Sequence, residues 1–396
     1  MKRILIYILM IFAIATLSKA SNPDTIPNGF SRSLSWHIGA EATPSFIPGT
    51  NNFLKGNNNE LKRVSTGLSG DIRGDFSFRN DTREGMLYKG LYQGIGVGIN
   101  SFFANSLLGT PSTLYIYQGA PIVHFSKRLW LGYEWRFGAA FGWKYYDEDY
   151  ADDNSAVSTP VTAMLGLGFK LNYGLSDRWT LSLGFNGIHY SNGNTSWPNA
   201  GVNAIGASIG IAYSLKTEPQ HVTAIPSWLA QEADKGKWIY DIMAYVAWRK
   251  RVVNVGDEPR LCPGRFGIVG LQFSPLRKLN RYFAVGPSLD LQWDESSNLE
   301  PYWVEGTMGV DTKFERPPFS KQLSIGLSAH AELIMPIFTV NAGIGYGLVT
   351  PKGEKRFYQS LALKTFLTEK IFINVGYRLG GFKDPQNLML GMGIRL

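Results

Sequence analysis

The chain has few of the residues that would point to a covalent scaffold or a metal centre. It contains one cysteine, Cys262, which therefore cannot form a disulfide within the chain. Its five histidines are scattered and no pair of cysteines exists, so the spacing typical of a metal site is absent. Charged residues make up only 18% of the sequence, and no apolar run after residue 20 is long enough for a membrane-spanning helix. A disulfide-rich fold, a zinc site and a helical membrane protein are excluded.

The first 20 residues have the pattern of an export signal. Lys2 and Arg3 precede an apolar core over 4–17, and Ser18-Lys19-Ala20 fits a small-x-small cleavage site. A signal peptide over 1–20 is predicted, without a lipoprotein site, because residue 21 is serine. The formal net charge of +8 is compatible with anionic lipid headgroups or with ordinary solubility. Export argues against a nucleic-acid partner, and no nucleic-acid motif is present.

Apolar and polar residues alternate with a period of two along most of the chain, which also contains 44 glycines and 13% aromatic residues. Such alternation predicts strands with one apolar face. Eight strands are expected before residue 216, at 35–47, 64–78, 91–103, 113–124, 129–145, 161–175 and two within 178–215. Eight more are expected at 238–252, 266–275, 282–293, 322–335, 337–349, 357–368, 371–380 and 388–396. The stretch 298–313 is ambiguous and is interpreted as a long external loop.

The two faces of these strands differ in a way that distinguishes membrane barrels from soluble ones. In 129–145 one face is aromatic and aliphatic, while the other carries glycines with Glu134 and Arg136. Opposite charges and glycines fit the crowded lumen of a small barrel, and the apolar face fits lipid. The predicted class is an all-β transmembrane antiparallel β-barrel. The alternative is an exported soluble β-sandwich.

The chain divides into two similar halves. The segment DRWTLSLGFNG from Asp177 resembles EKIFINVGYRL from Glu369, which indicates an internal duplication. We expect a barrel over 21–215 that carries the site, a linker over 216–236, and a second barrel-like repeat over 237–396 without it. A short helix is expected to begin at Pro226 in the linker. Two tandem eight-stranded barrels are favoured because 216–236 is long for a turn within one barrel, and a single sixteen-stranded barrel is the alternative.

The hairpin 178–215 carries the candidate chemistry. His189 and Ser191 fall on the apolar face of its first strand, and Asn203 is in phase with the apolar residues of the returning strand. If the mature N-terminus is periplasmic, the seventh strand ends at the cell surface. The pattern then allows acyl transfer, with His189 as general base, Ser191 as nucleophile and Asn192 or a nearby backbone N–H at the oxyanion. The structural alternative is that these polar residues simply lie above the apolar band.

The same residues carry a resemblance to a known family. HYSN at 189–192, followed by PNAGVN at 198–203, resembles the signature hairpin of the outer-membrane lipid A 3-O-deacylases (PagL-type), also called acyloxyacyl hydrolases. YQGIGVG at 92–98 is similar too, and the resemblance covers 36–215. It implies an eight-stranded outer-membrane barrel with a Ser-His-Glu triad on its outside. On that basis Ser191 and His189 are catalytic, and Asn192 is the oxyanion residue.

This chain departs from the family pattern at one position. The acidic member of the triad falls at Asn203, which can hold an imidazole tautomer but cannot stabilise an imidazolium by charge. In the second half, His189 aligns with Gly381 and Ser191 with Lys383, so that half is expected to be catalytically silent.

The resemblance implies an outer-membrane enzyme that acts on lipopolysaccharide through its lipid A, is surrounded by outer-membrane lipid, and needs no cofactor. Whether it forms a homodimer is left open. The alternative function is a non-enzymatic barrel: a pore, an adhesin or a structural protein. A sixteen-stranded barrel would be wide enough for an aqueous channel.

Overall fold

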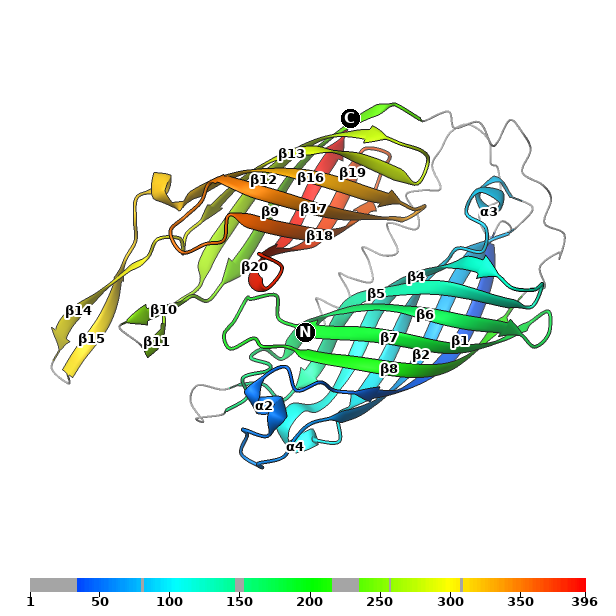
Figure 1. Cartoon of the computed structure of the whole chain (residues 1–396), viewed down its shortest axis with the longest axis horizontal. Coiled ribbons are helices and arrows are strands. Elements are labelled where there is room, and N and C mark those ends of the chain that lie inside the picture. Colours follow the sequence, from blue (N-terminus) through cyan, green and yellow to red (C-terminus); the bar gives the residue numbers. More distant parts are fainter. Residues whose placement is uncertain (1–33, 80–81, 147–152, 216–234, 256–257, 307–308) are drawn as a thin grey trace. The chain divides into compact units, whose positions relative to one another are not determined.

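The structure is a computed structural model that describes residues 34–79, 82–146, 153–215, 235–255, 258–306 and 309–396. It is almost entirely β and contains two closed antiparallel barrels of eight strands each (Figure 1). None of the helices in these ranges is long and apolar enough to cross a membrane. The prediction of two tandem eight-stranded barrels is confirmed, and the alternatives of one sixteen-stranded barrel and a soluble sandwich are wrong.

The first barrel closes because its first strand pairs with its last: Ile38 lies opposite Gly74 on one side and Tyr213 on the other. Its strands follow one another around the barrel in chain order. They are β1 (Leu34–Phe46), β2 (Thr66–Phe78), β3 (Tyr92–Ser101), β4 (Gly109–His124), β5 (Leu129–Trp143), β6 (Val161–Gly174), β7 (Trp179–Ser191) and β8 (Val202–Ser214). Three short helices lie between them: α2 (Asn52–Lys55), α3 (Arg83–Leu87) and α4 (Asn105–Leu108).

The second barrel closes in the same way, through pairing of its first strand with its last. Its strands are β9 (Trp238–Arg249), β12 (Phe266–Lys278), β13 (Phe283–Asp294), β16 (Leu323–Ile334), β17 (Phe338–Val349), β18 (Phe357–Phe366), β19 (Ile371–Gly380) and β20 (Asp384–Arg395). Two small hairpins are inserted between barrel strands: β10 (Val252–Val255) with β11 (Glu258–Leu261), and β14 (Glu300–Gly306) with β15 (Gly309–Glu315). A 3₁₀ turn, η3 (Phe319–Gln322), precedes β16.

Some expectations need correction or fall elsewhere. The stretch 298–313, interpreted as a loop, contains most of the β14–β15 hairpin, which projects beyond the end of the second barrel (Figure 1). The hairpin β10–β11 was not expected at all. The predicted signal peptide over 1–20 lies outside the described residues, as do the helix expected from Pro226 and the linker as far as residue 234.

The outside of the first barrel is apolar, and its lumen is polar. Ile72, Leu167 and Phe185 are each more than half exposed although they lie in regular strands. Residues of the opposite phase, such as Glu134 and Arg136, are almost completely buried. A soluble barrel would show the reverse arrangement, so the first barrel has the faces of a β-barrel that spans a membrane. The second barrel has the same two faces, with Leu271 and Ile344 exposed.

Opposite charges satisfy one another inside the first barrel. Arg73 Nη1 lies 2.7 Å from Glu41 Oε2, and its Nη2 lies 2.6 Å from Glu134 Oε2. Lys170 Nζ bridges the same two carboxylates, and Arg136 also pairs with both. Since every member is less than a tenth exposed, the charges are compensated by their neighbours rather than by bulk water.

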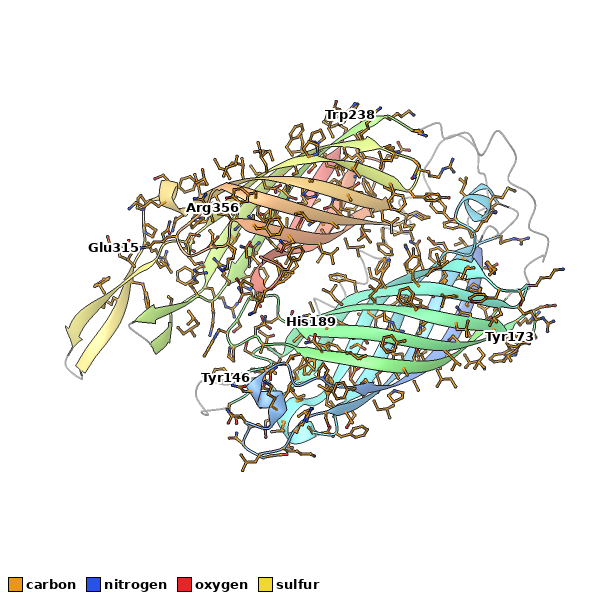
Figure 2. All side chains as sticks on the ribbon, in the orientation of Figure 1. Tyr146, Tyr173, His189, Trp238, Glu315 and Arg356 are labelled. Atoms are coloured by element: carbon orange, nitrogen blue, oxygen red, sulfur yellow. The ribbon has the colours of Figure 1, made fainter. Side chains whose placement is uncertain are left out.

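Connections at one end of the first barrel carry the local structure that surrounds the candidate site. At the other end, 125–128 and 175–178 are short turns, whereas the connection between β2 and β3 is longer and contains α3; the connections after β1, β3, β5 and β7 are all longer than those two turns. Figure 2 shows His189 and Tyr146 near this looped end, and Tyr173 near the opposite end. In barrels of the outer membrane, the longer loops face the cell exterior.

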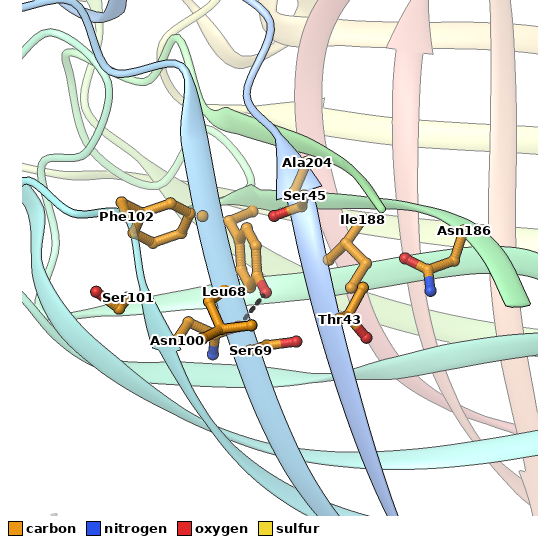
Figure 3. A pocket seen from close by; sticks show the side chains of 12 residues that line it. Thr43, Ser45, Leu68, Ser69, Asn100, Ser101, Phe102, Asn186, Ile188 and Ala204 are labelled. Carbon is orange, nitrogen blue, oxygen red and sulfur yellow. Dashed lines mark hydrogen bonds between the residues drawn. The ribbon is translucent and has the colours of Figure 1, made fainter. Parts of the chain in front are cut away.

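The lumen of the first barrel is packed. A space of about 10 Å³ lies among Thr43, Asn100, Asn186 and Ile188 (Figure 3). Tyr190 also lines it and donates a hydrogen bond of 3.1 Å to Asn100 Oδ1. Such a space holds about one water molecule.

Candidate functional site

The hairpin β7–β8 brings the three predicted residues to the outside of the first barrel. His189 and Ser191 share a phase with Leu183 and Phe185, which are more than half exposed, whereas the intervening Tyr190 is buried. Asn203 lies directly opposite His189 in the ladder. All three therefore face outward at the looped end of the barrel, next to the apolar outer surface.

His189 and Asn203 form a cross-strand hydrogen bond. His189 Nδ1 lies 2.7 Å from Asn203 Oδ1. A carbonyl oxygen can only accept, so in this orientation Nδ1 carries the proton and Nε2 keeps its lone pair. Nε2 is the nitrogen that a general base needs, and it lies on the side of the ring away from Asn203. Asn203 thus holds the imidazole in the tautomer that would activate a hydroxyl group.

Ser191 lies two residues beyond His189 on the same face. Side chains at i and i+2 are about 6–7 Å apart at the backbone, a gap that two inclined side chains can bridge. No hydrogen bond joins His189 to Ser191 within the described part of the chain. Contacts between a nucleophile and its base are often long without substrate and tighten when it binds.

Asn192 does not lie with the other three in this structure. Its side chain is 5% exposed and its Nδ2 donates to Ser158 Oγ at 2.9 Å. Its backbone N–H donates to Asn199 Oδ1 at 3.0 Å. A role at the oxyanion, which stays a prediction, therefore requires one of these donors to exchange its partner when substrate binds.

The connection after β1 supports the His189–Asn203 pair from outside the hairpin. Thr50 Oγ1 accepts a hydrogen bond of 3.4 Å from Asn203 Nδ2. Asn51 caps α2 by accepting from Leu54 N–H, and its own Nδ2 donates to the carbonyl of Gly201 at 3.0 Å. One connection thus touches both Asn203 and Gly201, the residue just before the returning strand.

Gly201 lies against the imidazole. Its φ is +72°, in the left-handed region, and a Cβ on it would lie 2.9 Å from His189 Cε1 and 2.9 Å from the Tyr190 carbonyl oxygen. Only glycine fits this position without strain or displacement of the ring. The shape of the site therefore depends on a residue that contributes no functional group.

Sequence reasoning missed Thr50, Asn51 and Gly201. For Gly201 a signal exists, since a glycine just before a strand often marks a positive φ. For Asn51 the signal is an asparagine that precedes a short helical turn. For Thr50 no local signal exists, because its contact with Asn203 spans 153 positions of sequence.

The second barrel contains a similar trio in a different place. His330 Nδ1 lies 2.8 Å from Asn341 Oδ1, and His330 Nε2 lies 2.9 Å from Ser328 Oγ. These side chains point into the lumen and are at most 7% exposed, and Ser328 Oγ also donates to Asp290 Oδ2 at 2.7 Å. A lipid outside the barrel cannot reach them, so they are a polar network of the interior. Gly381 and Lys383 stand in or beside the β19–β20 turn, where the first half carries His189 and Ser191.

The described residues can also be compared with the requirements of a metal site and of a reactive thiol. Among the described residues, no group of three His, Cys, Asp or Glu side chains is arranged to hold a metal ion. Cys262 lies in the connection between β11 and β12 and is 1% exposed. Burial raises the pKa of its thiol to about 11, so the nucleophilic thiolate is scarce at neutral pH.

The solved structures that match this chain have little sequence identity to it. Neisserial surface protein A is 11% identical, with a TM-score of 0.29, and the match covers 45% of this chain and 96% of that one. The siderophore receptor PirA from Acinetobacter baumannii is 9% identical with a TM-score of 0.23, covering 88% and 56%. The outer membrane protein Omp33 from the same organism is 7% identical with a TM-score of 0.17, covering 92% and 99%. No curated protein sequence matches the chain.

Two family models match the chain, one in each half. Residues 75–212 match the model of lipid A 3-O-deacylase (PagL), and this range contains His189, Ser191 and Asn203. Residues 238–396 match the model of the acyloxyacyl hydrolase C-terminal domain, so the second barrel corresponds to a recognised part of such proteins. The chain therefore belongs to the PagL-type family of lipid A 3-O-deacylases and acyloxyacyl hydrolases.

Proposed function

We propose that the protein is an outer-membrane carboxylic ester hydrolase that removes an acyl chain from lipid A or a related glycolipid. The observation that carries the proposal is the 2.7 Å bond between His189 and Asn203, beside Ser191 on the lipid-facing side of the first barrel. These residues lie in the half that matches the lipid A deacylase model. Lipid A occupies the outer leaflet, at the level of the looped end of the barrel.

The first half of the reaction forms an acyl-enzyme. Ser191 Oγ attacks the carbonyl carbon of the ester while its proton moves to His189 Nε2. The oxygen of the tetrahedral intermediate takes the negative charge, with Asn192 as the proposed donor to it. The bond between the acyl carbon and the sugar oxygen then breaks, and the sugar oxygen takes the proton from His189.

The second half of the reaction returns the enzyme to its starting state. Water gives a proton to His189 Nε2 and attacks the acyl carbon, and the fatty acid leaves as Ser191 recovers its proton. Throughout both halves Asn203 Oδ1 accepts from His189 Nδ1 and keeps the ring in place. The acyl chain would lie along the apolar outer face below the site, where Gly187 is flanked in the ladders by Leu167 and Ile205. These steps use side chains and water alone.

Lipid A composition tests this function directly. Cells that produce the protein should contain lipid A lacking one ester-linked acyl chain, seen by mass spectrometry as the loss of one hydroxyacyl or acyl mass together with free fatty acid. Identical lipid A in cells with and without the protein would contradict the proposal. Ion conductance in planar bilayers would then support the alternative of a pore.

An acid at position 203 should accelerate the enzyme. Asn203→Asp keeps the shape of the side chain and adds a negative charge beside the imidazolium that forms during acyl transfer. We expect kcat to rise by about 10- to 1,000-fold, because acid-to-amide changes at this position of Ser-His-acid sites cost at least that much. The measurement is fatty-acid release from purified lipid A in detergent. An unchanged or lower kcat in a correctly folded variant would show that Asn203 does not serve as the third member.

A methyl group at position 201 should displace the imidazole. In Gly201→Ala the new Cβ would clash with His189 Cε1 and a residue with a side chain would hold a φ of +72°. We expect activity to fall by about 10- to 100-fold, the effect of misplacing a catalytic group by about 1 Å. The matched control is Gly74→Ala on the outside of β2, where a Cβ meets nothing within 4 Å. Equal activities of the two variants would contradict the positioning role of Gly201.

A further inference from the structure

The second barrel carries exposed cations at the end from which the hairpins β10–β11 and β14–β15 extend. The connections 350–356 and 381–383 lie at the same end, and they contain the basic rim, which consists of Lys355, Arg356 and Lys383. Figure 2 shows Arg356 at this end of the barrel and Trp238 near the other. In barrels of the outer membrane the longer connections face the exterior. The basic rim therefore stands on the side of the outer leaflet.

The two connections pack against each other, which brings their cations together. A Cβ on Gly380 would lie 3.2 Å from Lys355 Cβ, so the stem of this lysine covers Gly380. The backbone N–H of Lys383 donates to the Gly380 carbonyl oxygen at 3.2 Å. Lys355 and Lys383 thus meet at one residue from two connections, and Arg356 follows directly along the chain.

The protein leaves the charge of the basic rim largely uncompensated. None of its three side chains forms an ion pair with a described residue. Glu354, in the same connection, lies 3.3 Å from Arg249 Nη2, and its side chain is only 14% exposed. Asp384 is the exposed carboxylate beside Lys383, so three cations face one anion at this surface. Such an excess attracts anionic groups.

Two aromatic rings border the basic rim on the outside of the barrel. Phe357 begins β18 in phase with the exposed Leu361, and its ring centroid lies 5.5 Å from that of Phe382. Phe382 is 66% exposed and has a φ of +61° in a tight turn, where glycine or asparagine would be less strained. Its N–H donates to Gln359 Oε1 at 2.6 Å, which holds the turn on β18. Strain of this kind is typical of positions that serve a function.

We propose that this surface of the second barrel binds the phosphorylated headgroup of lipid A in the outer leaflet. Lys355, Arg356 and Lys383 pair with phosphate oxygens, to which a guanidinium can donate two N–H groups. Phe357 and Phe382 lie at the upper boundary of the apolar face and contact the first part of the acyl chains. Lipid A combines phosphates with acyl chains directly beneath them, which is the order of cations and rings here. Binding of this kind does not depend on ester hydrolysis.

Native mass spectrometry of the full chain in detergent can count bound lipid A molecules. All proteins carry Ser191→Ala, so that hydrolysis cannot consume the ligand. The rim variant, Lys355→Gln with Arg356→Gln and Lys383→Gln, should bind one lipid A molecule about 10- to 100-fold more weakly than the parent. Each cation near an anionic headgroup contributes about fivefold. Parent-like binding by a folded rim variant would overturn the proposal.

A second triple variant at the other end of the barrel provides the matched control. It removes the same charge from exposed residues as Lys235→Gln, Arg277→Gln and Lys370→Gln. This control should bind lipid A as the parent does. Equal weakening in both triple variants would mean that binding follows total charge, and the proposed surface would then be wrong.

The chemistry of the lipid distinguishes the sources of phosphate. Dephosphorylated lipid A should bind the parent about as weakly as lipid A binds the rim variant. Phosphatidylglycerol that binds as tightly as lipid A would overturn the choice of a phosphorylated glycolipid. Displacement of lipid A by millimolar inorganic phosphate would overturn the choice of a lipid.

Phe382→Asn separates a ligand contact from a role in the fold. Asparagine adopts a positive φ more readily, so the urea midpoint of the second barrel should be unchanged or higher. Lipid A binding should weaken by about 3- to 10-fold because apolar contact is lost. A lower midpoint with unchanged binding would show that the ring serves the fold and would contradict its place in the site. Loss of binding in the rim variant, with lipid A unaltered in cells, would count against the proposed hydrolysis alone.

Discussion

Replacing Ser191 with alanine should abolish the release of fatty acid from lipid A. Without the hydroxyl group no acyl-enzyme can form, and the loss of the nucleophile in Ser-His sites lowers kcat by about 10⁶-fold, leaving only the contribution of binding and oxyanion contacts. Lipid A from cells that produce Ser191→Ala should therefore match that of cells without the protein by mass spectrometry. Purified Ser191→Ala in detergent should release no fatty acid above background.

A serine in a similar setting provides the control for this experiment. Ser112 lies near the start of β4, exposed on the first barrel at the looped end, and Ser112→Ala should deacylate lipid A at the parent rate. Both variants should fold, since neither side chain is buried. Undiminished fatty-acid release by Ser191→Ala would show that another group is the nucleophile, and the assignment of His189 and Asn203 would then fall with it.

Neutralising Glu134 should destabilise the first barrel more than any change at the site. Glu134 accepts from Arg73 at 2.6 Å, from Lys170 at 3.0 Å and from Arg136 Nε at 3.0 Å, all inside the lumen. In Glu134→Gln three buried cations would share the single carboxylate of Glu41. Removing one member of a buried ion network costs about 3–5 kcal/mol, because the remaining charges stay buried without compensation.

The loss of stability in Glu134→Gln can be measured by urea unfolding in detergent or lipid. The folded fraction is monitored by the heat-dependent gel mobility of folded barrels. The expected result is a lower urea midpoint with an unchanged dependence on urea concentration. The control is Glu60→Gln, an exposed carboxylate in the connection after β1, which should change the free energy of unfolding by no more than about 0.5 kcal/mol. Equal urea midpoints for the two variants would mean that the ion network of the lumen makes no net contribution to the free energy of unfolding.

The period of two was sufficient to predict the fold class and the two faces of most strands. In β5 it assigned Glu134 and Arg136 to the lumen, where the structure has them. It could not predict which partners close the network, because the contacts of Glu134 reach residues 36 and 61 positions away. Register and loop packing, not alternation, set those distances.

Irregular segments were the least predictable part of the fold. The hairpin β14–β15 was interpreted as a loop, and its short strands pair only with each other and not with the barrel. In β10–β11, Pro259 argues against a strand from sequence alone because proline has no N–H to donate to a ladder, yet both strands of a two-stranded ribbon are edge strands, where proline is tolerated. Such pairings depend on turn geometry rather than on a periodic apolar face.

The candidate site likewise has features that alternation within a strand predicts and features that depend on long-range packing. His189, Ser191 and Asn203 could be placed on one face by counting residues along a hairpin, because strand parity is local. The His189–Asn203 hydrogen bond requires that these two residues lie opposite each other in the ladder. Counting along the strands cannot establish this, because a register shift of two residues keeps every side chain on the same face. Thr50 and the close approach of Gly201 depend on how distant connections pack, and no pattern in the sequence encodes that.

Each barrel closes on itself, and this bears on the cooperativity of unfolding. In the described ranges, strands β1–β8 pair only with one another, and the barrel strands from β9 to β20 pair only with one another. The ladders of the described strands therefore couple residues within one barrel. Unfolding should accordingly show two transitions, and Glu134→Gln should shift the transition of the first barrel while leaving that of the second where it was.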